Sequence, residues 1–287
     1  MRTEYEYGPG FRATDDMRSA FEEFGYIIIR GILDAEEMSK LRRSIEENEE
    51  LMMNSFELSD GDERRSRACV WSHPGNDVAG LVVRSQKIAG TCEKLMGGEV
   101  YHYHSKLMMK EARTGGKFVW HQDYGYWYKN GCLTPDLMSV MIAIDRCERA
   151  NGCLQVLEKS HKCGRIEHLR VGGQTGADME RVELIKNICS LKYVELQPGD
   201  ALFFHSNLLH NSSANTSDNR RWVLIPAYNR RSNNPAFEHH HPLYTKLDIV
   251  PDDAIKSCTT YVDNTGKEYM DPDTDKTIVK LKPDEQS

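Results

Sequence analysis

The sequence lacks an excess of basic residues and a long apolar run. Its 37 lysines and arginines are outnumbered by 44 aspartates and glutamates, for a net charge of −7, so it has no basic field of the kind that attracts nucleic acid or an anionic membrane surface. The longest apolar runs, such as residues 140–144, are far shorter than the roughly 20 residues that span a bilayer. Residues 1–6 contain no apolar core of a secretory signal. We therefore expect a cytoplasmic protein whose partners are neither nucleic acids nor membranes.

Cysteines are also few and widely spaced. The 287 residues include eight of them and no CxxC pair, which is typical of reduced thiols rather than of a disulfide framework. A chain of this length can form one all-β domain. Because the composition turns polar from Ser257 onward, we expect a single domain over residues 1–256 and a loosely held polar tail over residues 257–287.

Two helices and a series of short strands are predicted. One helix should begin at residues 14–16 and end at Gly25, and a second should begin at Asp34, where Glu37 completes a capping box. Apolar or alternating runs between turn residues predict strands at 26–33, 100–110, 137–144, 153–157, 201–205 and 221–228, and around 121–123. This mainly β pattern favours a double-stranded β-helix (jelly roll, cupin-like) with flanking N-terminal helices.

Three connecting segments carry their own expectations. Residues 57–67 are polar and charged, which is typical of a mobile loop. Asn151-Gly152 is a hairpin-type turn signal. Residues 163–192 combine a glycine-rich loop at 172–176 with a short helix around Val182 and Ile185. An insertion of this kind often acts as a lid, or it covers one end of a barrel.

The stretch from Trp120 to Tyr128 contains the strongest functional signal. In an extended strand, His121 and Asp123 project from the same face because they are two residues apart. With a distant imidazole, for which we choose His210, they would form the two-histidine, one-carboxylate triad that binds non-haem Fe(II) and leaves positions open. The bare pair also occurs by chance, and a hydrogen-bonded core histidine is then the default interpretation.

Residues that follow His210 add a second signal. Arg221 lies eleven residues further on and begins a predicted strand, and Ser212 lies two residues after His210. A buried guanidinium needs a carboxylate partner, and the distal carboxylate of 2-oxoglutarate suits its bidentate geometry. Ser212 could offer the same carboxylate a hydroxyl.

These residues, in this order, resemble the phytanoyl-CoA dioxygenase family of Fe(II)- and 2-oxoglutarate-dependent oxygenases, which also includes ectoine hydroxylase. The matching segments are 21–26, 120–123, 151–154, 160–162 and 198–201, followed by His210, Ser212 and Arg221. Residues 124–128 and the region from Asn229 to Pro242 are most similar to small-substrate members described as hypophosphite dioxygenases.

The resemblance implies a set of roles. Fe(II) would be held by His121, Asp123 and His210, and 2-oxoglutarate would chelate it, with Arg221 and Ser212 gripping the other carboxylate. Lys106 matches a position that contacts the cosubstrate in relatives. The implied reaction uses O₂, converts 2-oxoglutarate to succinate and CO₂, and hydroxylates a small polar substrate. Halogenating relatives replace the carboxylate ligand, so Asp123 favours hydroxylation.

The substrate and the rival functions stay open. Tyr124, Tyr126 and Trp127 are candidate pocket residues whose aromatic faces could hold a cation, and core packing is the alternative. Residues 239–241 are three histidines in a row, which we interpret as a polar loop rather than a second metal site. A cupin-type metal protein with redox-neutral chemistry and a catalytically silent binding module are the alternative functions. No pattern indicates the oligomeric state.

Overall fold

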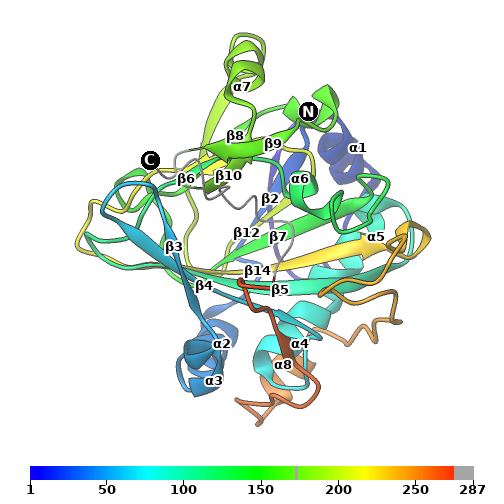
Figure 1. Cartoon of the computed structure of the whole chain (residues 1–287). Helices are drawn as coiled ribbons and strands as arrows, with labels where there is room; N and C mark the ends of the chain where they lie inside the picture. The colour runs from blue at the N-terminus through cyan, green and yellow to red at the C-terminus, as the bar shows by residue number, and fades with distance from the viewer. Residues whose placement is uncertain (172–173, 275–287) are drawn as a thin grey trace.

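The computed structural model describes residues 1–171 and 174–274, which form two facing β-sheets with most helices packed on the outer side of one of them (Figure 1). The major sheet has the strand order β1-β2-β12-β7-β14-β5-β4-β15, and β3 also pairs with β4. Only β1 and β2 pair in parallel among these strands. The strands are β1 (Glu4–Glu6), β2 (Tyr26–Arg30), β3 (Phe56–Ser59), β4 (Arg65–Ser72), β5 (Val100–Lys110), β7 (Leu137–Ala143), β12 (Ala201–His205), β14 (Arg221–Arg230) and β15 (Glu268–Tyr269).

The minor sheet faces the major one and has the order β11-β8-β13-β6, with every pair antiparallel. Its strands are β6 (Phe118–His121), β8 (Leu154–Leu157), β11 (Leu191–Val194) and β13 (His210–Ser212). A separate hairpin of β9 (His168–Val171) and β10 (Gln174–Ala177) lies next to it. The jelly-roll architecture expected from the sequence is therefore confirmed.

Helices cover the outer face of the major sheet, where α2, α4 and α8 lie below it in Figure 1. Thr14 caps α1 and Gly25 ends it with a positive φ of 84°, and Asp34 and Glu37 form the capping box of α2, as predicted. The helices are α1 (Asp15–Phe24), α2 (Ala35–Glu46), α3 (Glu49–Met53), α4 (Val78–Arg84), α5 (Thr91–Met96), α6 (Asp123–Trp127), α7 (Met179–Lys186) and α8 (Ala254–Ser257).

Alternation along the strands divides the core into two layers. On β2, Ile27 and Ile29 pack against the helices, whereas Tyr26 and Ile28 belong to the apolar layer between the two sheets. The strand is buried on both faces, which explains why its sequence is a continuous apolar run rather than an alternating one. The same alternation, which a register shift interrupts near the start of β5, places residues of β5, β7 and β14 inside the jelly roll.

The prediction of a mobile loop at residues 57–67 is wrong. Residues 56–72 form the β3–β4 hairpin, whose β4 strand pairs with β5 over five residues. The polar composition suggested a loop because alternate residues of β3 face solvent. Glu57 and Ser59 are exposed, whereas Phe56 and Leu58 turn inward. The hairpin thus supplies one wall of the interior cavity.

The prediction of a strand around residues 121–123 is also wrong after His121. Strand β6 ends at His121, and α6 begins at Asp123, so the aromatic residues from Tyr124 onward lie on a short helix. A second local difference affects His102, which regular strand alternation would place on the same face as His104. A register shift between Ala227 and Tyr228 turns it to the outer side, where its ring lies near that of Tyr228.

Two further expectations fall partly outside the described residues. Residues 172–173 of the glycine-rich loop and residues 275–287 of the tail are among those not described. Around them, the 163–192 insertion forms β9, β10 and α7, and Val182 and Ile185 are buried. The turn predicted at Asn151-Gly152 links the two sheets through a short 3₁₀ helix instead of forming a hairpin.

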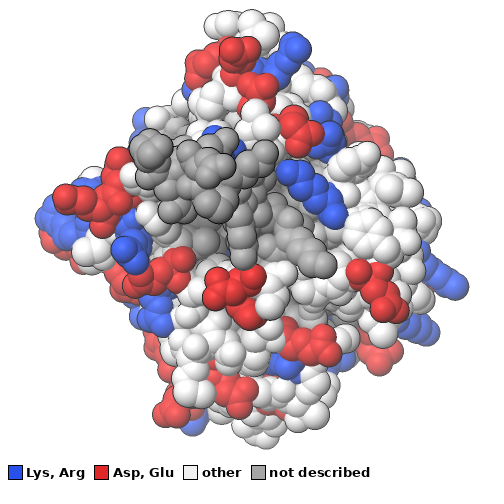
Figure 2. Space-filling view, viewed as in Figure 1, with Lys and Arg blue, Asp and Glu red and all other residues white. Residues whose placement is uncertain are grey.

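The described part of the predicted tail packs against the body. Strand β15 pairs with β4, and the Lys267 ammonium lies 2.6 Å from the Asp77 carboxylate with both side chains buried. The division of the chain at residue 256 stays a prediction. None of the described helices is both long and apolar enough to span a membrane. On the face shown in Figure 2, the acidic and basic side chains of the described residues are interspersed with one another.

Candidate active site

Two neighbouring strands of the minor sheet bring together the predicted triad. His121 ends β6 and His210 begins β13, and the two are register partners in the antiparallel pair. Gln122 is extended (φ −116°, ψ 135°), so the side chain of Asp123 returns to the same side although a helix begins there. Asp123 Oδ1 lies 4.0 Å from His121 Nε2 and 3.8 Å from His210 Nε2. All three side chains are buried, and among the described residues they alone form a three-ligand group.

Hydrogen bonds orient both imidazoles for metal binding. His121 Nδ1 lies 2.8 Å from the Val119 carbonyl oxygen, and His210 Nδ1 lies 2.8 Å from the Leu208 carbonyl oxygen. A carbonyl only accepts, so each Nδ1 carries the proton and each Nε2 keeps its lone pair. Burial lowers the pKa of both imidazoles below the usual range, which favours the neutral form that a metal requires.

Ser139 on β7 fixes the carboxylate of the triad. Its hydroxyl donates to Asp123 Oδ2 over 2.6 Å, and Ser139 is buried inside the major sheet. Because one carboxylate oxygen is engaged, the other, Oδ1, is the one presented beside the two Nε2 atoms. Two imidazole nitrogens and one carboxylate oxygen on one side of a site form the donor set that suits non-haem Fe(II).

A cavity of about 300 Å³ opens in front of the triad. Lys106 and His104 of β5 line it, and Lys106 lies close enough to both triad imidazoles for its charge to lower their pKa further. The Lys106 side chain forms no hydrogen bond or ion pair with any residue that the structure describes. The lining residues from other elements are Phe56, Glu57, Leu58, Ser59, Ala68, Val70, Phe118, Tyr126, Trp127, Asn130, Ser139, Arg170, Gln174, Thr175, Ile225, His240, His241 and Met270.

Arg221 and Ser212 lie in the same interior, beyond the cavity lining. Met108 of β5 lines the cavity, and Lys110 and Arg221 follow deeper in the jelly roll as register partners on β5 and β14. Arg221 is 3% exposed, and its Nε has no hydrogen-bond partner. A buried guanidinium with an unused donor is what a bound carboxylate would satisfy, so these residues fit the cosubstrate implied above.

The three aromatic candidates lie on the short helix α6, and their side chains point in different directions. Trp127 is 4% exposed, lines the cavity and contacts Tyr103 and His104 edge to face. Tyr126 also lines it, and its hydroxyl donates to the Thr175 carbonyl of β10 over 2.6 Å. Tyr124 packs away from the cavity, which argues against its predicted contact with the substrate. The helical turn, rather than strand alternation, decides which ring points inward.

Residues 239–241 fold over the same cavity. The His241 ring stacks on that of His104 at 4.6 Å, and His240 Nε2 lies 3.1 Å from His241 Nε2. Within the described chain these histidines form no three-ligand group, so the geometry favours the polar loop over a second metal site. His240 and His241 thus line the pocket together with Trp127.

The sequence alone did not point to several residues of the site. His104 and Lys110 share the inner face of β5 with Lys106, so strand periodicity could have found them. Ser139 and the hairpin residue Phe56 could not be found in this way, because their place depends on which strands are neighbours.

Comparison with known proteins agrees with this geometry. The family model described as phytanoyl-CoA dioxygenase (PhyH) matches residues 21–223. The L-proline trans-4-hydroxylase of Streptomyces griseoviridis is 30% identical over 252 residues, which cover 82% of this chain and 94% of that protein. An ectoine dioxygenase of Stutzerimonas stutzeri is 24% identical over 261 residues, covering 80% of this chain and 85% of the relative.

Solved structures share the fold. EctD from S. alaskensis in its apo form has a TM-score of 0.71 at 19% identity, covering 87% of this chain and 91% of the other. The same protein with 2-oxoglutarate and 5-hydroxyectoine has a TM-score of 0.69 at 21% identity, covering 86% and 90%. Because the family model spans more than half of the sequence and the proline hydroxylase aligns over most of it, this chain belongs to the phytanoyl-CoA dioxygenase family.

Proposed function

We propose that this protein is an Fe(II)- and 2-oxoglutarate-dependent dioxygenase that hydroxylates a small polar molecule carrying an anionic group. The observation that carries the proposal is the buried triad, in which two Nε2 lone pairs and one carboxylate oxygen face a cavity. Membership of the dioxygenase family supports the reaction type.

Each residue of the site has a distinct task in this reaction. His121, Asp123 and His210 would hold Fe(II) from one side and leave its other positions open. Arg221 and Ser212 would bind the distal carboxylate of 2-oxoglutarate, and Lys106 would contact the cosubstrate closer to the triad. When bound, iron and 2-oxoglutarate supply an oxidative decarboxylation to succinate and CO₂ that is coupled to hydroxylation with O₂. Because Asp123 supplies the carboxylate that halogenating relatives replace, the reaction would be hydroxylation rather than halogenation.

Charge balance in the cavity favours an anionic group on the substrate. Asp123 and one carboxylate of 2-oxoglutarate would neutralise Fe(II), and Arg221 would neutralise the second carboxylate, so the positive charge of Lys106 remains. The acidic Glu57, which also lines the cavity, is paired with Arg65 over 2.6 Å. A positively charged wall disfavours a purely cationic substrate beside Trp127.

The substrates of relatives agree with this class. The related enzymes are a proline hydroxylase and an ectoine dioxygenase, and both of those substrates are small molecules with a carboxylate. Hypophosphite, another small anion, stays a prediction from the resemblance of residues 124–128. A cytoplasmic location likewise stays a prediction.

Binding of the cosubstrate tests the assignment directly. Anaerobic addition of Fe(II) and 2-oxoglutarate should produce the weak visible charge-transfer band of a chelated keto acid, and His210→Ala should abolish it because one ligand is lost. Lys117→Met, a change on the solvent-exposed side, is the control. A wild-type protein without the band, or an unchanged band in the histidine variant, would overturn the assignment.

Succinate release then identifies the substrate class. We expect release to rise with amino acids, phosphonates or hypophosphite more than with quaternary amines that lack an acidic group, or with acyl-CoAs. Turnover that does not depend on 2-oxoglutarate would favour the cupin-type alternative. Metal binding without succinate from any mixture would favour a silent binding module.

A further inference from the structure

Two cysteines near opposite ends of the 163–192 insertion lie against each other. Cys163 ends a short 3₁₀ helix that begins at Ser160, and Cys189 lies in the connection between α7 and β11. The thiol of Cys189 is partly buried, and its pKa is raised by this burial and by a hydrogen bond with the thiol of Cys163. Both cysteines are reduced in the structure. The fold therefore brings together two thiols that a β-hairpin and a helix separate in the sequence.

Packing and backbone hydrogen bonds hold the two thiols at this place. Cys163 and Ile185 line one surface cavity, and Cys189 packs against the apolar cluster to which Ile185 belongs. The Cys189 N–H donates to the Ile185 carbonyl oxygen over 2.8 Å. The carbonyl oxygen of the next residue, Ser190, accepts from the Glu158 N–H over 2.9 Å. The contact between the thiols thus follows from the backbone path after α7 and after β8, and not from the rotamer of one flexible side chain.

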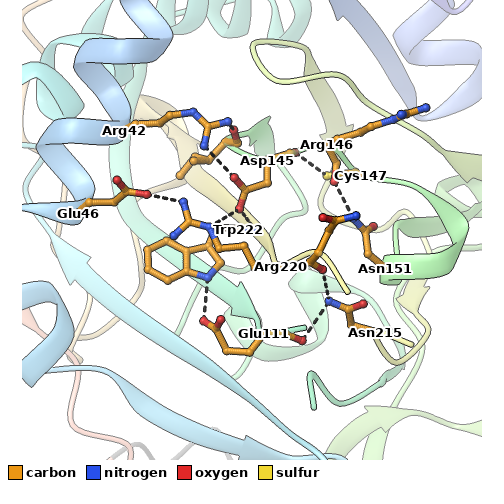
Figure 3. Close-up of polar contacts among 12 residues, drawn as sticks. Arg42, Glu46, Glu111, Asp145, Arg146, Cys147, Asn151, Asn215, Arg220 and Trp222 are labelled. Atoms are coloured by element: carbon orange, nitrogen blue, oxygen red, sulfur yellow. Dashed lines mark hydrogen bonds and ion pairs between the residues drawn. The ribbon is translucent and has the colours of Figure 1, made fainter. Parts of the chain in front are cut away.

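The other thiols are shielded or engaged elsewhere. Five of the remaining six cysteines are buried. Burial raises the pKa of Cys147 to about 12, and its thiol donates to the Asp145 carbonyl oxygen over 3.5 Å (Figure 3). Cys258 is half-buried, and its thiol donates to the Thr260 carbonyl oxygen over 3.3 Å. Because oxidants react with exposed thiolates, a dilute oxidant in solution should reach the exposed Cys163 first.

The segment after Cys163 is attached to the metal-binding strand. The Gly164 carbonyl oxygen accepts from Gln122 Nε2 over 2.8 Å, and the Ile166 N–H donates to Gln122 Oε1 over 2.7 Å. Gln122 is buried and lies between the first two ligands of the triad in the sequence. Thr175, further along the same insertion, lines the active-site cavity. The thiol pair is therefore one residue away from the contacts that connect the insertion to the triad.

We propose that Cys163 and Cys189 form a redox-active dithiol, which hydrogen peroxide converts reversibly to a disulfide that ties the two ends of the insertion together beside Gln122. The inference goes beyond the proposed function and does not depend on it. Contact between two thiols is the arrangement that a disulfide needs, since the sulfur atoms have only to approach to the bonding distance of about 2.05 Å. A reducing environment keeps the pair open, so the modification is a response to an oxidant and not a permanent part of the fold.

The chemistry uses one peroxide for each pair of thiols. Cys163, the exposed member, attacks as its thiolate: an S–O bond forms, the O–O bond breaks, and the leaving hydroxide takes up the thiol proton to give water and a sulfenic acid. The Cys189 thiolate then attacks this sulfur, so that the S–S bond forms, the S–O bond breaks, and the hydroxide leaves as water with the Cys189 proton. Peroxide accepts the two electrons that the thiols lose, and a dithiol reductant such as dithiothreitol returns them.

A pair that only packs together makes a different prediction. In that case the exposed Cys163 would be oxidised alone, to the sulfenic and then the sulfinic acid, and the thiol of Cys189 would stay free. The product of oxidation therefore separates the two interpretations.

The test treats the full chain with equimolar hydrogen peroxide in the presence of EDTA, so that no iron takes part. After free thiols are alkylated, mass spectrometry without reduction should find the peptides of Cys163 and Cys189 joined. Titration of the denatured protein should show two fewer free thiols than the eight of the reduced chain, and dithiothreitol should restore all eight. Amide hydrogen exchange of residues 164–168 should be slower in the oxidised protein, because the disulfide opposes local opening around Gln122.

Serine variants keep the proposal falsifiable. Cys163→Ser changes an exposed side chain, so it should fold as wild type does and form no disulfide with peroxide. Cys189→Ser should leave Cys163 as the sulfenic or sulfinic acid. Cys258→Ser, which removes a half-buried thiol elsewhere, is the matched control and should form the disulfide as wild type does. Sulfinic acid at Cys163 of the wild type without the crosslink, disulfides formed instead with other cysteines, or unchanged exchange at residues 164–168 would overturn the inference.

Discussion

The two triad imidazoles are oriented by their own strands. Each Nδ1 donates to the carbonyl two residues earlier, Val119 for His121 and Leu208 for His210, so the metal-facing nitrogen is fixed before any metal arrives. The carboxylate is held differently, because its partner Ser139 comes from the opposite sheet. The triad is therefore clamped between the two sheets and not carried by one.

Replacing Ser139 tests this clamp. In Ser139→Ala, Asp123 Oδ2 loses its donor, and we expect the affinity for Fe(II) or Co(II) to fall roughly ten- to hundredfold, as for other groups that support a metal ligand. Competitive metal titration measures the change. Ser190→Ala, at an exposed serine, is the matched control. Equal affinities in the two variants would show that the hydroxyl does not support the ligand.

The sequence predicted the triad residues and the arginine but not the groups that support them. His121 and Asp123 can be found from their two-residue spacing, and the resemblance to the family adds His210. The role of Ser139 depends on strand order, namely on β7 lying beside β14 in the major sheet. Such neighbours are set by tertiary packing, which local propensity does not encode.

At the scale of elements, α6 shows how packing overrides propensity. Its aromatic residues favour a strand, yet residues 123–127 form a helix whose Gly125 lies against the ring of His168. A Cβ at this position would lie 2.1 Å from His168 Cε1. His168 in turn accepts a hydrogen bond from the backbone of Gln122, between the two metal ligands, so helix and triad are coupled.

Gly125→Ala should therefore destabilise the protein, although alanine is the better helix former. His168 is buried and cannot move aside freely, so we expect the free energy of unfolding to fall by about 1–3 kcal/mol, as in other overpacked sites. Urea denaturation measures it, and metal titration should show weaker binding as the ring is displaced. Gly8→Ala, where a Cβ meets nothing within 4 Å, is the control. A Gly125→Ala variant as stable as the control would contradict the coupling.

At the scale of the molecule, the segment after residue 256 contributes to the body of the fold. Strand β15 extends the major sheet, and Lys267 and Asp77 form an ion pair in which each side chain is 1% exposed (Figure 1). Asp77 also caps α4 by accepting from Gly80 N, and it accepts from the backbone of Asp263. Composition predicted a loose tail because polar residues are usually solvated, and it could not show that one lysine finds a buried partner 190 residues away.

Replacing Lys267 and truncating the chain test this contribution together. Lys267→Met leaves Asp77 covered but without its cation, so we expect the free energy of unfolding to fall by about 3–5 kcal/mol, the usual effect of breaking a buried pair. A chain ending at residue 256 should also lose stability, because it lacks both Lys267 and Asp263. A chain ending at residue 274 keeps every described contact of this segment and serves as the control. If the chain ending at 256 unfolds at the same urea concentration as the control, residues 257–274 are a dispensable tail, as their composition alone would suggest.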